Sequence, residues 1–373
     1  MAESVNNFNH NNPYTVGVEE EYMICDPNTG TLISKADEIM NSLSNDMIDR
    51  YSYELILSEI EVNTPVCKNV AEAIDKIILL RNHTANLGKN LDYKIGISGT
   101  HPTAICKEQT FVNNDSYQWV ANQLNYYAKR NITFATHVHI AVDNSECAIH
   151  VVNSLRRWIA PLLALSTNSP FFEGEKTGLK SSRTFQFGVF PRTNIPNTFK
   201  NFNDYSNILN KYLLAESIQK SRHIWWKIRP HINYGTIEFR ICDMQRSLKR
   251  LEMIIALSQA LVFQAVQDYK NESIIEEYNM EFLYDSLWKA SRFPIDVKLI
   301  DPVSEEVSSL KEQIEIMINY VRAALKHFNT SHIIDTIYEI CNGGSEADDQ
   351  IKVFDKEGYL GLNKYLMENI DFN

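Results

Sequence analysis

The 373-residue chain is 44% hydrophobic and 22% charged, the composition of an ordinary soluble protein of one to three domains. Its formal net charge of −11 argues against nucleic acid as the main partner, because phosphate binding needs basic patches. An anionic substrate such as a nucleotide would therefore need metal ions or local arginines to hold it.

The first predicted strand, residues 14–25, contains Glu19, Glu20 and Glu21 in succession. Neighbouring side chains of a strand point to opposite faces, so Glu19 and Glu21 share one face about 6.6–6.8 Å apart. Two ionised carboxylates on one face of a core strand repel each other and lose hydration, so they need cations or hydrogen-bond donors between them. Taken alone, the stretch is more typical of an edge strand with a solvated acidic face. The functional interpretation depends on partners supplied later in the chain.

A turn at residues 26–30 leads to a predicted hairpin partner at 31–34 and a helix at 36–43. The second acidic strand follows, in which residues 58–62 alternate so that Glu59, Glu61 and Asn63 fall on one face and Pro65 ends the strand. The spacing of Asn69 and Glu72 predicts a capping box that opens a helix.

Residues 92–98 indicate a buried strand that runs into the loop Gly99-Thr100-His101-Pro102. A helix is predicted over 116–130 and a strand over 133–143, with His137 and His139 on one face. Such a pair is by itself more often structural than a ligand set. Ser145 can cap an apolar helix that runs to about residue 166.

Residues 168–197 form a long segment rich in Gly, Pro, Ser and Arg that includes Arg183 and Arg192. A loop of this length is usually functional or disordered, and its phenylalanines favour an ordered one. The stretch 224–230, which contains Arg229, precedes the last predicted strand, 234–243, where Glu238 and Arg240 share a face.

From residue 247 the pattern is helical, with helices predicted over 248–269, 274–291, 304–328 and 331–341 and a final short helix after Gly343-Gly344. The predicted organisation is a polar N-terminal tail (1–12), a catalytic sheet-and-helix core (13–246) and a helical C-terminal region (247–373) packed on the same domain.

The six cysteines are far apart without a CxxC pair, which fits reduced thiols better than a disulfide framework or a zinc site. Residues 1–12 contain no basic segment followed by an apolar core, and no apolar run has the length of a membrane span. We therefore expect a cytoplasmic protein without a membrane partner.

The polar strand faces combine carboxylates, imidazoles and arginines. Carboxylates on two or three strands, with one histidine, could hold two or three Mg²⁺ or Mn²⁺ ions, and neighbouring arginines would bind phosphate oxygens. The combination suggests phosphoryl transfer, in which positioning and charge neutralisation dominate. The sequence has no GxxxxGK(S/T), GxGxxG or GxSxG motif, which argues against a P-loop, a Rossmann site and a serine-hydrolase elbow.

Several collinear motifs between about residues 15 and 244 carry a family resemblance. They are GVEEE (17–21), EVNTPVC (61–67), GTHP (99–102), THVHI (136–140), LSTNSPF (165–171), TGLKSSR (177–183), PR (191–192), IRPH (228–231) and GTIEFR (235–240). With these motifs the sequence resembles the type 2 glutamate–cysteine ligase or carboxylate–amine ligase family of the glutamine synthetase superfamily. The resemblance implies an α+β fold: a curved, mainly antiparallel sheet of glutamine-synthetase-like type flanked by helices, with a helical C-terminal third and with ATP and metals in its funnel.

The resemblance also implies roles for individual residues. The expected metal ligands are Glu19, Glu21, Glu61, His137 and Glu238. The expected ATP or acyl-phosphate contacts are His139, Arg183, Arg229 and Arg240. The expected substrate contacts are Thr100, His101 and Arg192, and the expected catalytic residues are Arg183, Arg240 and Glu61. Glu59 is secondary. The run Ala347-Asp348-Asp349-Gln350 departs from the family, which often has a basic residue before the glutamine, and this puts the acceptor or C-terminal contacts in doubt.

The implied reaction has two steps. ATP phosphorylates a carboxylate, which we expect to be the γ-carboxylate of glutamate. An amine then attacks the acyl phosphate. L-cysteine is taken as the default amine because the resemblance suggests it, and the residues themselves do not identify the acceptor. Two alternatives stay open, namely a metal-dependent phosphoesterase or nucleotide hydrolase, and a catalytically idle binding protein of the same fold. The expected partners are the small-molecule substrates, with a homodimer as the default assembly.

Overall fold

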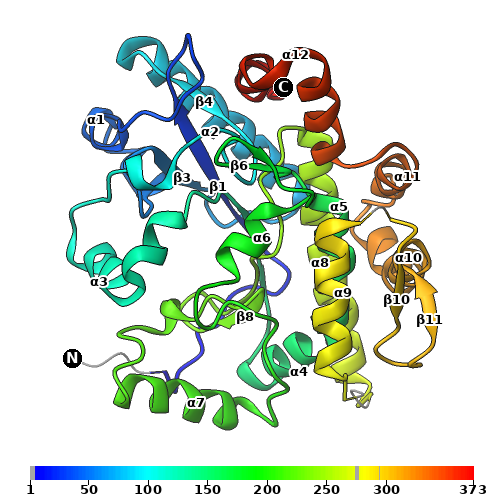
Figure 1. Cartoon of the computed structure of the whole chain (residues 1–373). Coiled ribbons are helices and arrows are strands. Elements are labelled where there is room, and N and C mark those ends of the chain that lie inside the picture. Colours follow the sequence, from blue (N-terminus) through cyan, green and yellow to red (C-terminus); the bar gives the residue numbers. More distant parts are fainter. Residues whose placement is uncertain (1–4, 274–276, 294) are drawn as a thin grey trace.

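Seven antiparallel strands form the central sheet of the computed structural model, which describes residues 5–273, 277–293 and 295–373 (Figure 1). The strand order is β2-β3-β1-β5-β9-β8, and β4 pairs with the end of β1 beside β5. The strands are β1 (Val16–Cys25), β2 (Tyr51–Tyr53), β3 (Glu59–Asn63), β4 (Lys94–Gly96), β5 (Thr136–Ala141), β8 (Ile228–His231) and β9 (Thr236–Phe239).

Strand register sorts the side chains of the sheet into a polar face and an apolar face. Glu19 lies opposite His137 and Glu21 lies opposite Glu61 across antiparallel pairs. Directly paired residues project from the same side of a sheet, so acidic and imidazole side chains from three strands share one face. The intervening residues are buried and almost all apolar: Val16, Val18, Tyr22, Ile24, Ile60, Val62, Val138, Ile140, Ile237 and Phe239.

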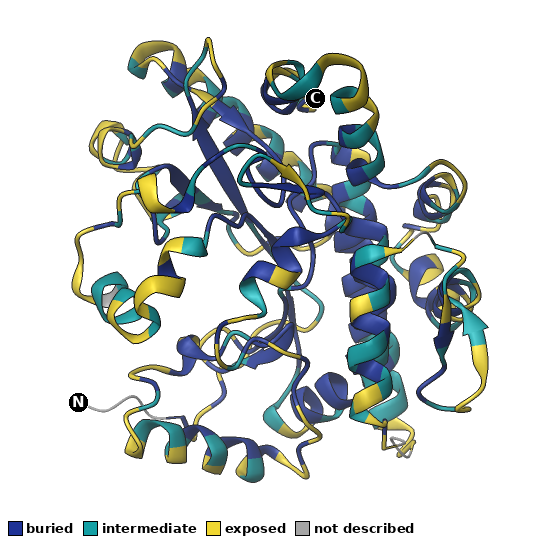
Figure 2. Ribbon diagram, viewed as in Figure 1, coloured by how far each residue is buried: buried dark blue, intermediate teal, exposed yellow. Residues whose placement is uncertain are grey.

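Three helices cover the apolar face: α2 (Val70–Leu91), α4 (Ser145–Leu155) and α8 (Leu248–Lys270). Most of the sheet is buried in Figure 2, and its polar face, opposite these three helices, lines a cleft. Burial of apolar surface, at roughly 25 cal/mol per Å², is the main force that holds these helices on the sheet.

The N-cap of α4 is Asn144 and not Ser145, because the Asn144 side chain accepts a hydrogen bond from the Cys147 amide. Asn69 caps α2 as predicted, but the Glu72 carboxylate bonds to the Lys68 amide, so the predicted capping box is incomplete. The predicted hairpin partner at 31–34 is reduced to one bridge, and the helix predicted over 116–130 divides into an α-helix and a 3₁₀ helix at residues 125–130.

The segment 168–197 contains a two-stranded hairpin and a short helix, and the helix α7 that follows it was not predicted. The elements of the first two thirds that lie outside the central sheet and its covering helices are α1 (Ala36–Ser42), α3 (Asp115–Leu124), α5 (Ile159–Ser166), β6 (Phe171–Phe172), β7 (Glu175–Lys176), α6 (Ser182–Phe187) and α7 (Phe202–Leu214). Val5 and Phe8 of the N-terminal segment are buried, and the Ser206 hydroxyl of α7 donates to the Val5 carbonyl.

In its described residues, the C-terminal third is helical apart from one hairpin. It consists of α9 (Met280–Arg292), β10 (Lys298–Ile300), β11 (Val307–Ser309), α10 (Leu310–His327), α11 (Ile333–Gly343) and α12 (Glu346–Glu368). The helix predicted over 304–328 begins later than expected, because Ser309 and Glu312 form a capping box that opens α10 after β11. The last helix is long and not short, with a break at Gly358, where φ is 65°. The first residues of the helix predicted over 274–291 lie outside the described residues, and its remainder corresponds to α9.

Candidate active site

The polar face of the sheet forms the floor of a cleft of about 590 Å³. Most of the residues that the sequence singled out line it: Glu19, Glu21, Glu61, His137, His139, Arg183, Arg229, Glu238 and Arg240. A cleft of this size is typical of small-molecule sites.

Glu19 and two histidines form the middle of the cleft floor. His137 Nδ1 lies 2.9 Å from Glu19 Oε2, and His139 Nε2 lies 3.2 Å from Glu19 Oε1. Burial alone would raise the pKa of Glu19, but the charge of His139 and bonds to both imidazoles bring it below its ordinary value. Burial, reinforced by Arg240, lowers the pKa of His137 to about 4. The His137 imidazole is therefore neutral near pH 7, as a metal ligand must be.

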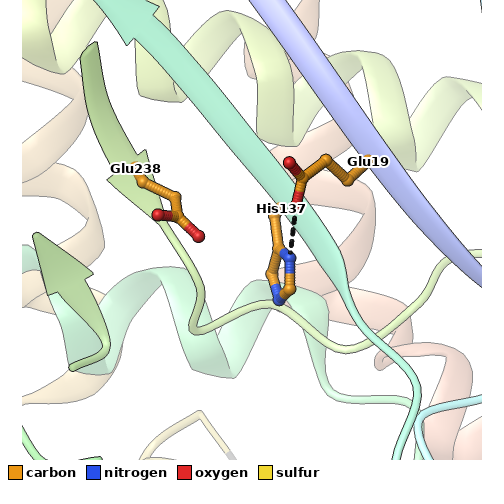
Figure 3. Close-up of side chains that lie close together, drawn as sticks. All are labelled: Glu19, His137 and Glu238. Carbon is orange, nitrogen blue, oxygen red and sulfur yellow. Dashed lines mark hydrogen bonds and ion pairs between the residues drawn. The ribbon is translucent and has the colours of Figure 1, made fainter. Parts of the chain in front are cut away.

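Two groups of ligand atoms meet at His137. Glu19, His137 and Glu238 offer atoms within 4.8 Å of one another, and so do Glu21, Glu61 and His137. Figure 3 shows the first group, with the side chains of β1, β5 and β9 on the same side of the sheet.

The charged forms of the two glutamates in the second group are disfavoured, because neighbouring cations and donors offset burial and mutual repulsion only in part. Glu21 accepts a hydrogen bond from the Ala135 amide, and Glu61 accepts one of 2.9 Å from the Asn63 side chain. Burial raises the pKa of Glu21 to about 7, although Arg183 lowers it in part. Burial and the charges of Glu19 and Glu21 raise the pKa of Glu61 to about 8. A bound cation would remove this conflict.

Two further glutamates enlarge the acidic end of the sheet. Glu54 lines the cleft and hydrogen-bonds Glu61, and burial followed by the charge of Glu61 raises its pKa well above the ordinary value. Glu59 is 2% exposed and does not line the cleft, and burial likewise raises its pKa. The sequence analysis missed Glu54 because this residue lies in the connection between β2 and β3, where no strand alternation relates it to the polar face.

Glu238 lies between two arginines at the other end of the floor. Arg229 Nε donates to Glu238 Oε2 at 2.5 Å, and Arg240 donates to Glu238 Oε1. Burial would raise the pKa of Glu238, but Arg229 and Arg240 hold it well below its ordinary value. Glu238 is thus already balanced by cations, whereas Glu21 and Glu61 are not.

Asp243 positions Arg183. The Arg183 guanidinium donates to the backbone carbonyls of Ile241 and Arg240, at 3.1 and 2.9 Å, and lies 3.8 Å from Asp243 Oδ1. The same buried carboxylate accepts bonds from Asn168, Ser169 and Ser181, which attach the 168–197 segment to the end of β9. The sequence analysis ended the last strand at Asp243 without assigning it a role.

The three predicted substrate contacts lie away from the cleft lining. Thr100 Oγ1 donates to the Phe171 carbonyl at 2.6 Å, and His101 Nε2 lies 2.7 Å from the Gly30 carbonyl. The Arg192 guanidinium is 5.8 Å from the centre of the Tyr212 ring. The structure does not bring these side chains to the polar sheet face.

Aromatic side chains that the sequence analysis did not assign form part of the cleft wall. The Tyr234 ring, in the turn between β8 and β9, stacks on His231 with 4.2 Å between centroids. His223, which also lines the cleft, stacks on Trp119 behind it with 4.3 Å between centroids. Tyr234 remains 55% exposed and lines the cleft, so its free face can receive a planar group.

The run Ala347-Asp348-Asp349-Gln350, where the sequence departs from the family, makes structural contacts at the start of α12. Asp348 receives bonds of 2.8 Å from Lys180 and forms the capping box of α12 with Ser345. Gln350 bonds Ser98 and Asn168. This region therefore connects α12 to the loops beside Asp243.

The family model for glutamate–cysteine ligase family 2 matches residues 15–365. The chain belongs to this family. Relatives named "Putative glutamate–cysteine ligase 2" include proteins from Solibacter usitatus, 34% identical over 96% of this chain and 94% of the relative, and Herpetosiphon aurantiacus, 32% identical over 93% and 90%. Family membership makes the chain a ligase that forms C–N bonds.

Solved structures of ligases share the fold. A glutamate–cysteine ligase from Francisella tularensis, in complex with AMP, has a TM-score of 0.73 at 12% identity, over 97% of this chain and 89% of its own. A bifunctional glutathione synthetase from Pasteurella multocida has a TM-score of 0.71 at 11% identity, over 95% of this chain and 52% of its own. The predicted α+β fold with its antiparallel sheet is confirmed. Among the residues that the structure describes, no helix is long and apolar enough to cross a membrane.

The donor atoms of this family 2 ligase fit hard divalent cations. Mg²⁺ and Mn²⁺ prefer carboxylate oxygens, and Mn²⁺ also accepts an imidazole. Glu21 and Glu61 offer carboxylates whose pKa values are raised by burial and by like charge, and His137 offers a neutral imidazole between the two groups of ligand atoms.

Proposed function

We propose that the chain is an ATP-dependent carboxylate–amine ligase. It activates a carboxylate as an acyl phosphate and joins it to an amine, forming an amide. One observation carries the proposal: a single sheet face presents under-neutralised carboxylates at one end and arginines at the other. Carboxylates alone cannot hold a polyphosphate, and arginines alone leave its metal unbound. Their combination suits a metal–nucleotide complex.

The metal-binding end would hold two or three Mg²⁺ or Mn²⁺ ions through Glu19, Glu21, Glu61, His137 and Glu238. Bound there, the ions would neutralise the charge of the triphosphate. The glutamate–cysteine ligase from Francisella tularensis, which shares this fold, was solved in complex with AMP, and this supports nucleotide binding by the fold. Glu238 would share its carboxylate between an ion and the two arginines that it now pairs with.

The arginine end would stabilise the phosphoryl group in transfer. Arg183 is held by backbone carbonyls and by Asp243, so its orientation is fixed before a substrate arrives. Arg229 and Arg240 would donate to phosphate oxygens together with His139. Positioning of this kind supplies most of the catalysis in phosphoryl transfer.

The reaction needs no protein nucleophile. A substrate carboxylate oxygen forms a bond to the γ-phosphorus of ATP and the bond to ADP breaks. The amine nitrogen then bonds to the acyl carbon, phosphate leaves, and a carboxylate of the polar face takes the amine proton, with Glu61 as the predicted catalytic carboxylate. Arg183 and Arg240 stay beside the phosphate oxygens throughout.

Glutamate is the proposed carboxylate substrate and cysteine the default acceptor, since the relatives are named as glutamate–cysteine ligases. Thr100, His101 and Arg192 remain predictions for substrate contact.

The test is ADP release with Mg²⁺, ATP and L-glutamate, with L-cysteine and then a panel of amino acids and amines added one at a time. Amine-dependent ADP release with a matching amide product is expected. Arg240→Met should abolish it, whereas Arg322→Met, at an exposed arginine, should not. ADP release that ignores every carboxylate and amine would establish a nucleotide hydrolase instead. Nucleotide binding without turnover over the whole panel would favour a binding protein.

A further inference from the structure

Lys227 is a buried lysine on the polar side of the sheet, next to the cleft but not part of its lining. It immediately precedes β8 and is 2% exposed. The Arg240 amide donates to the Lys227 carbonyl at 2.9 Å, which extends the pairing of β8 with β9 by one residue beyond Ile228 and Phe239. Paired residues project from the same face of a sheet, so Lys227 and Arg240 share a face. This is the polar face from which Arg229 also projects and which forms the cleft floor.

The surroundings of Lys227 are cationic and aromatic. Its Nζ lies 5.4 Å from the centre of the Phe187 ring, which lines the cleft. Burial, followed by the charges of Arg183 and Arg240, lowers the pKa of Lys227 to about 7. Asp243 is the nearby acid that counteracts this effect, and its oxygens already accept bonds from Asn168, Ser169 and Ser181.

Two neighbouring cationic donors in this corner lack an acceptor. Within the described ranges, the contact found for the Lys227 ammonium is the one with the Phe187 ring, and no ion pair involves it. Arg240 Nε is buried without a hydrogen-bond partner. A buried ammonium without a counterion costs free energy, and the contact with one aromatic ring compensates only a part of this cost. Such an arrangement is expected where a ligand supplies the missing negative charge.

We propose that Lys227 and Arg240 bind an oxyanion of a substrate, either a carboxylate or a phosphate, at the end of the cleft formed by β8 and β9. The inference rests on the proposed function, which places anionic substrates in this cleft. An oxyanion can accept from Lys227 Nζ and Arg240 Nε together, and charge-assisted bonds of this kind are about twice as strong as neutral ones. Lys227 is then a specificity-determining residue, and its side chain is covered by Phe187.

The test compares wild type with Lys227→Met, which keeps the length of the side chain, and Lys227→Arg, which keeps the charge. Lys249→Met serves as a control at an exposed lysine that pairs with Glu339. Calorimetric titrations use three probes: Mg²⁺–ATP, L-glutamate and inorganic phosphate. Lys227→Met should weaken at least one probe by about 10- to 100-fold, the loss expected for a hydrogen bond to a charged group. Lys227→Arg should recover much of this affinity.

Thermal stability separates binding from a structural role. Lys227→Met should raise the melting temperature of the free protein, because an unpaired buried charge is removed. A lysine whose role is only to pack on Phe187 would instead lower the melting temperature on replacement and leave the affinities unchanged.

The three probes also identify the source of the oxyanion. A loss confined to L-glutamate assigns the site to a carboxylate, and a loss for Mg²⁺–ATP or phosphate assigns it to a phosphate. Equal affinities of wild type and Lys227→Met for all probes, or no binding to wild type at all, overturn the inference. A Lys227-dependent affinity in a protein without ligase activity would sustain the anion site while the proposed function fails. Ligase activity together with unaltered binding by Lys227→Met would support the proposed function and overturn the anion site.

Discussion

Replacement of Glu20 should destabilise the fold and leave the active site intact, although two glutamates of the site flank it. Glu20 is completely buried and projects from β1 toward α2, away from the cleft. Arg81 Nε donates to Glu20 Oε2 at 3.0 Å, Arg81 Nη2 lies 2.5 Å from Glu20 Oε1, and the Tyr22 hydroxyl donates to Glu20 Oε2 at 2.6 Å. The rest of the Arg81 guanidinium bonds the carbonyls of Gln245, Arg246 and Asp371.

Glu20→Gln keeps the shape of the side chain and removes its charge, which leaves the Arg81 guanidinium buried without a counterion. Removal of one partner from a buried ion pair costs about 3–5 kcal/mol. The glutamine oxygen can still accept one bond from Arg81, so a loss near the lower end, about 3 kcal/mol, is expected. Glu21→Gln on the other face should cost no stability, because burial disfavours its charge and raises its pKa to about 7.

Urea denaturation in the presence of EDTA measures both variants, and Mn²⁺ titration measures their metal binding. Glu20→Gln should lose unfolding free energy and bind Mn²⁺ like wild type, and Glu21→Gln should show the opposite pattern. A loss below about 1 kcal/mol for Glu20→Gln, small beside the 3–5 kcal/mol of a broken buried pair, would refute the assignment of Glu20 to the core. A greater loss for Glu21→Gln than for Glu20→Gln would refute the division of the two faces.

Three further predictions concern the metals, the positioning of Arg183 and the α12 cap. Glu61→Gln should weaken Mn²⁺ binding at least about tenfold in calorimetry, since even indirect metal contacts contribute that much, and unchanged affinity would remove Glu61 from the ligand set. Asp243→Asn should lower kcat about hundredfold through misplacement of Arg183, and full activity in the ADP-release assay would show that Arg183 needs no such support. The Lys180–Asp348 pair should contribute about 1 kcal/mol at neutral pH, measured as the difference in urea stability between wild type and Asp348→Asn. Burial would raise the pKa of Asp348, but Lys180 lowers it below its ordinary value, so the difference should be complete above about pH 4 and vanish as the pH falls through the lowered pKa. A difference that persists in acid would contradict this assignment.

Alternation within a strand is sufficient to sort its side chains by face, which is why the shared polar face of Glu19, Glu21, Glu61 and His137 could be predicted. Alternation does not encode strand order. The positions of Glu61 opposite Glu21 and of Glu238 opposite His139 follow from register and could not be read from the chain.

Residues outside regular strands escaped prediction for a related reason. Glu54 reaches the cleft from the connection between β2 and β3, and Lys227 is buried next to Phe187 of α6, which lies far from it in the sequence. Helix starts shifted where a competing local bond was available, as at Asn144 and Ser309. The helix α7 was missed although Asn201 caps it, because its apolar residues alternate with many polar ones.

The most direct test of the proposed chemistry follows the oxygen atoms of the carboxylate substrate. L-glutamate labelled with ¹⁸O in the γ-carboxylate is incubated with the enzyme, Mg²⁺–ATP and the amine that supports ADP release, and the phosphate is analysed by mass spectrometry. An acyl phosphate transfers one carboxylate oxygen to phosphate, so one ¹⁸O per phosphate is expected. Unlabelled phosphate, formed by attack of water on ATP, would contradict the account.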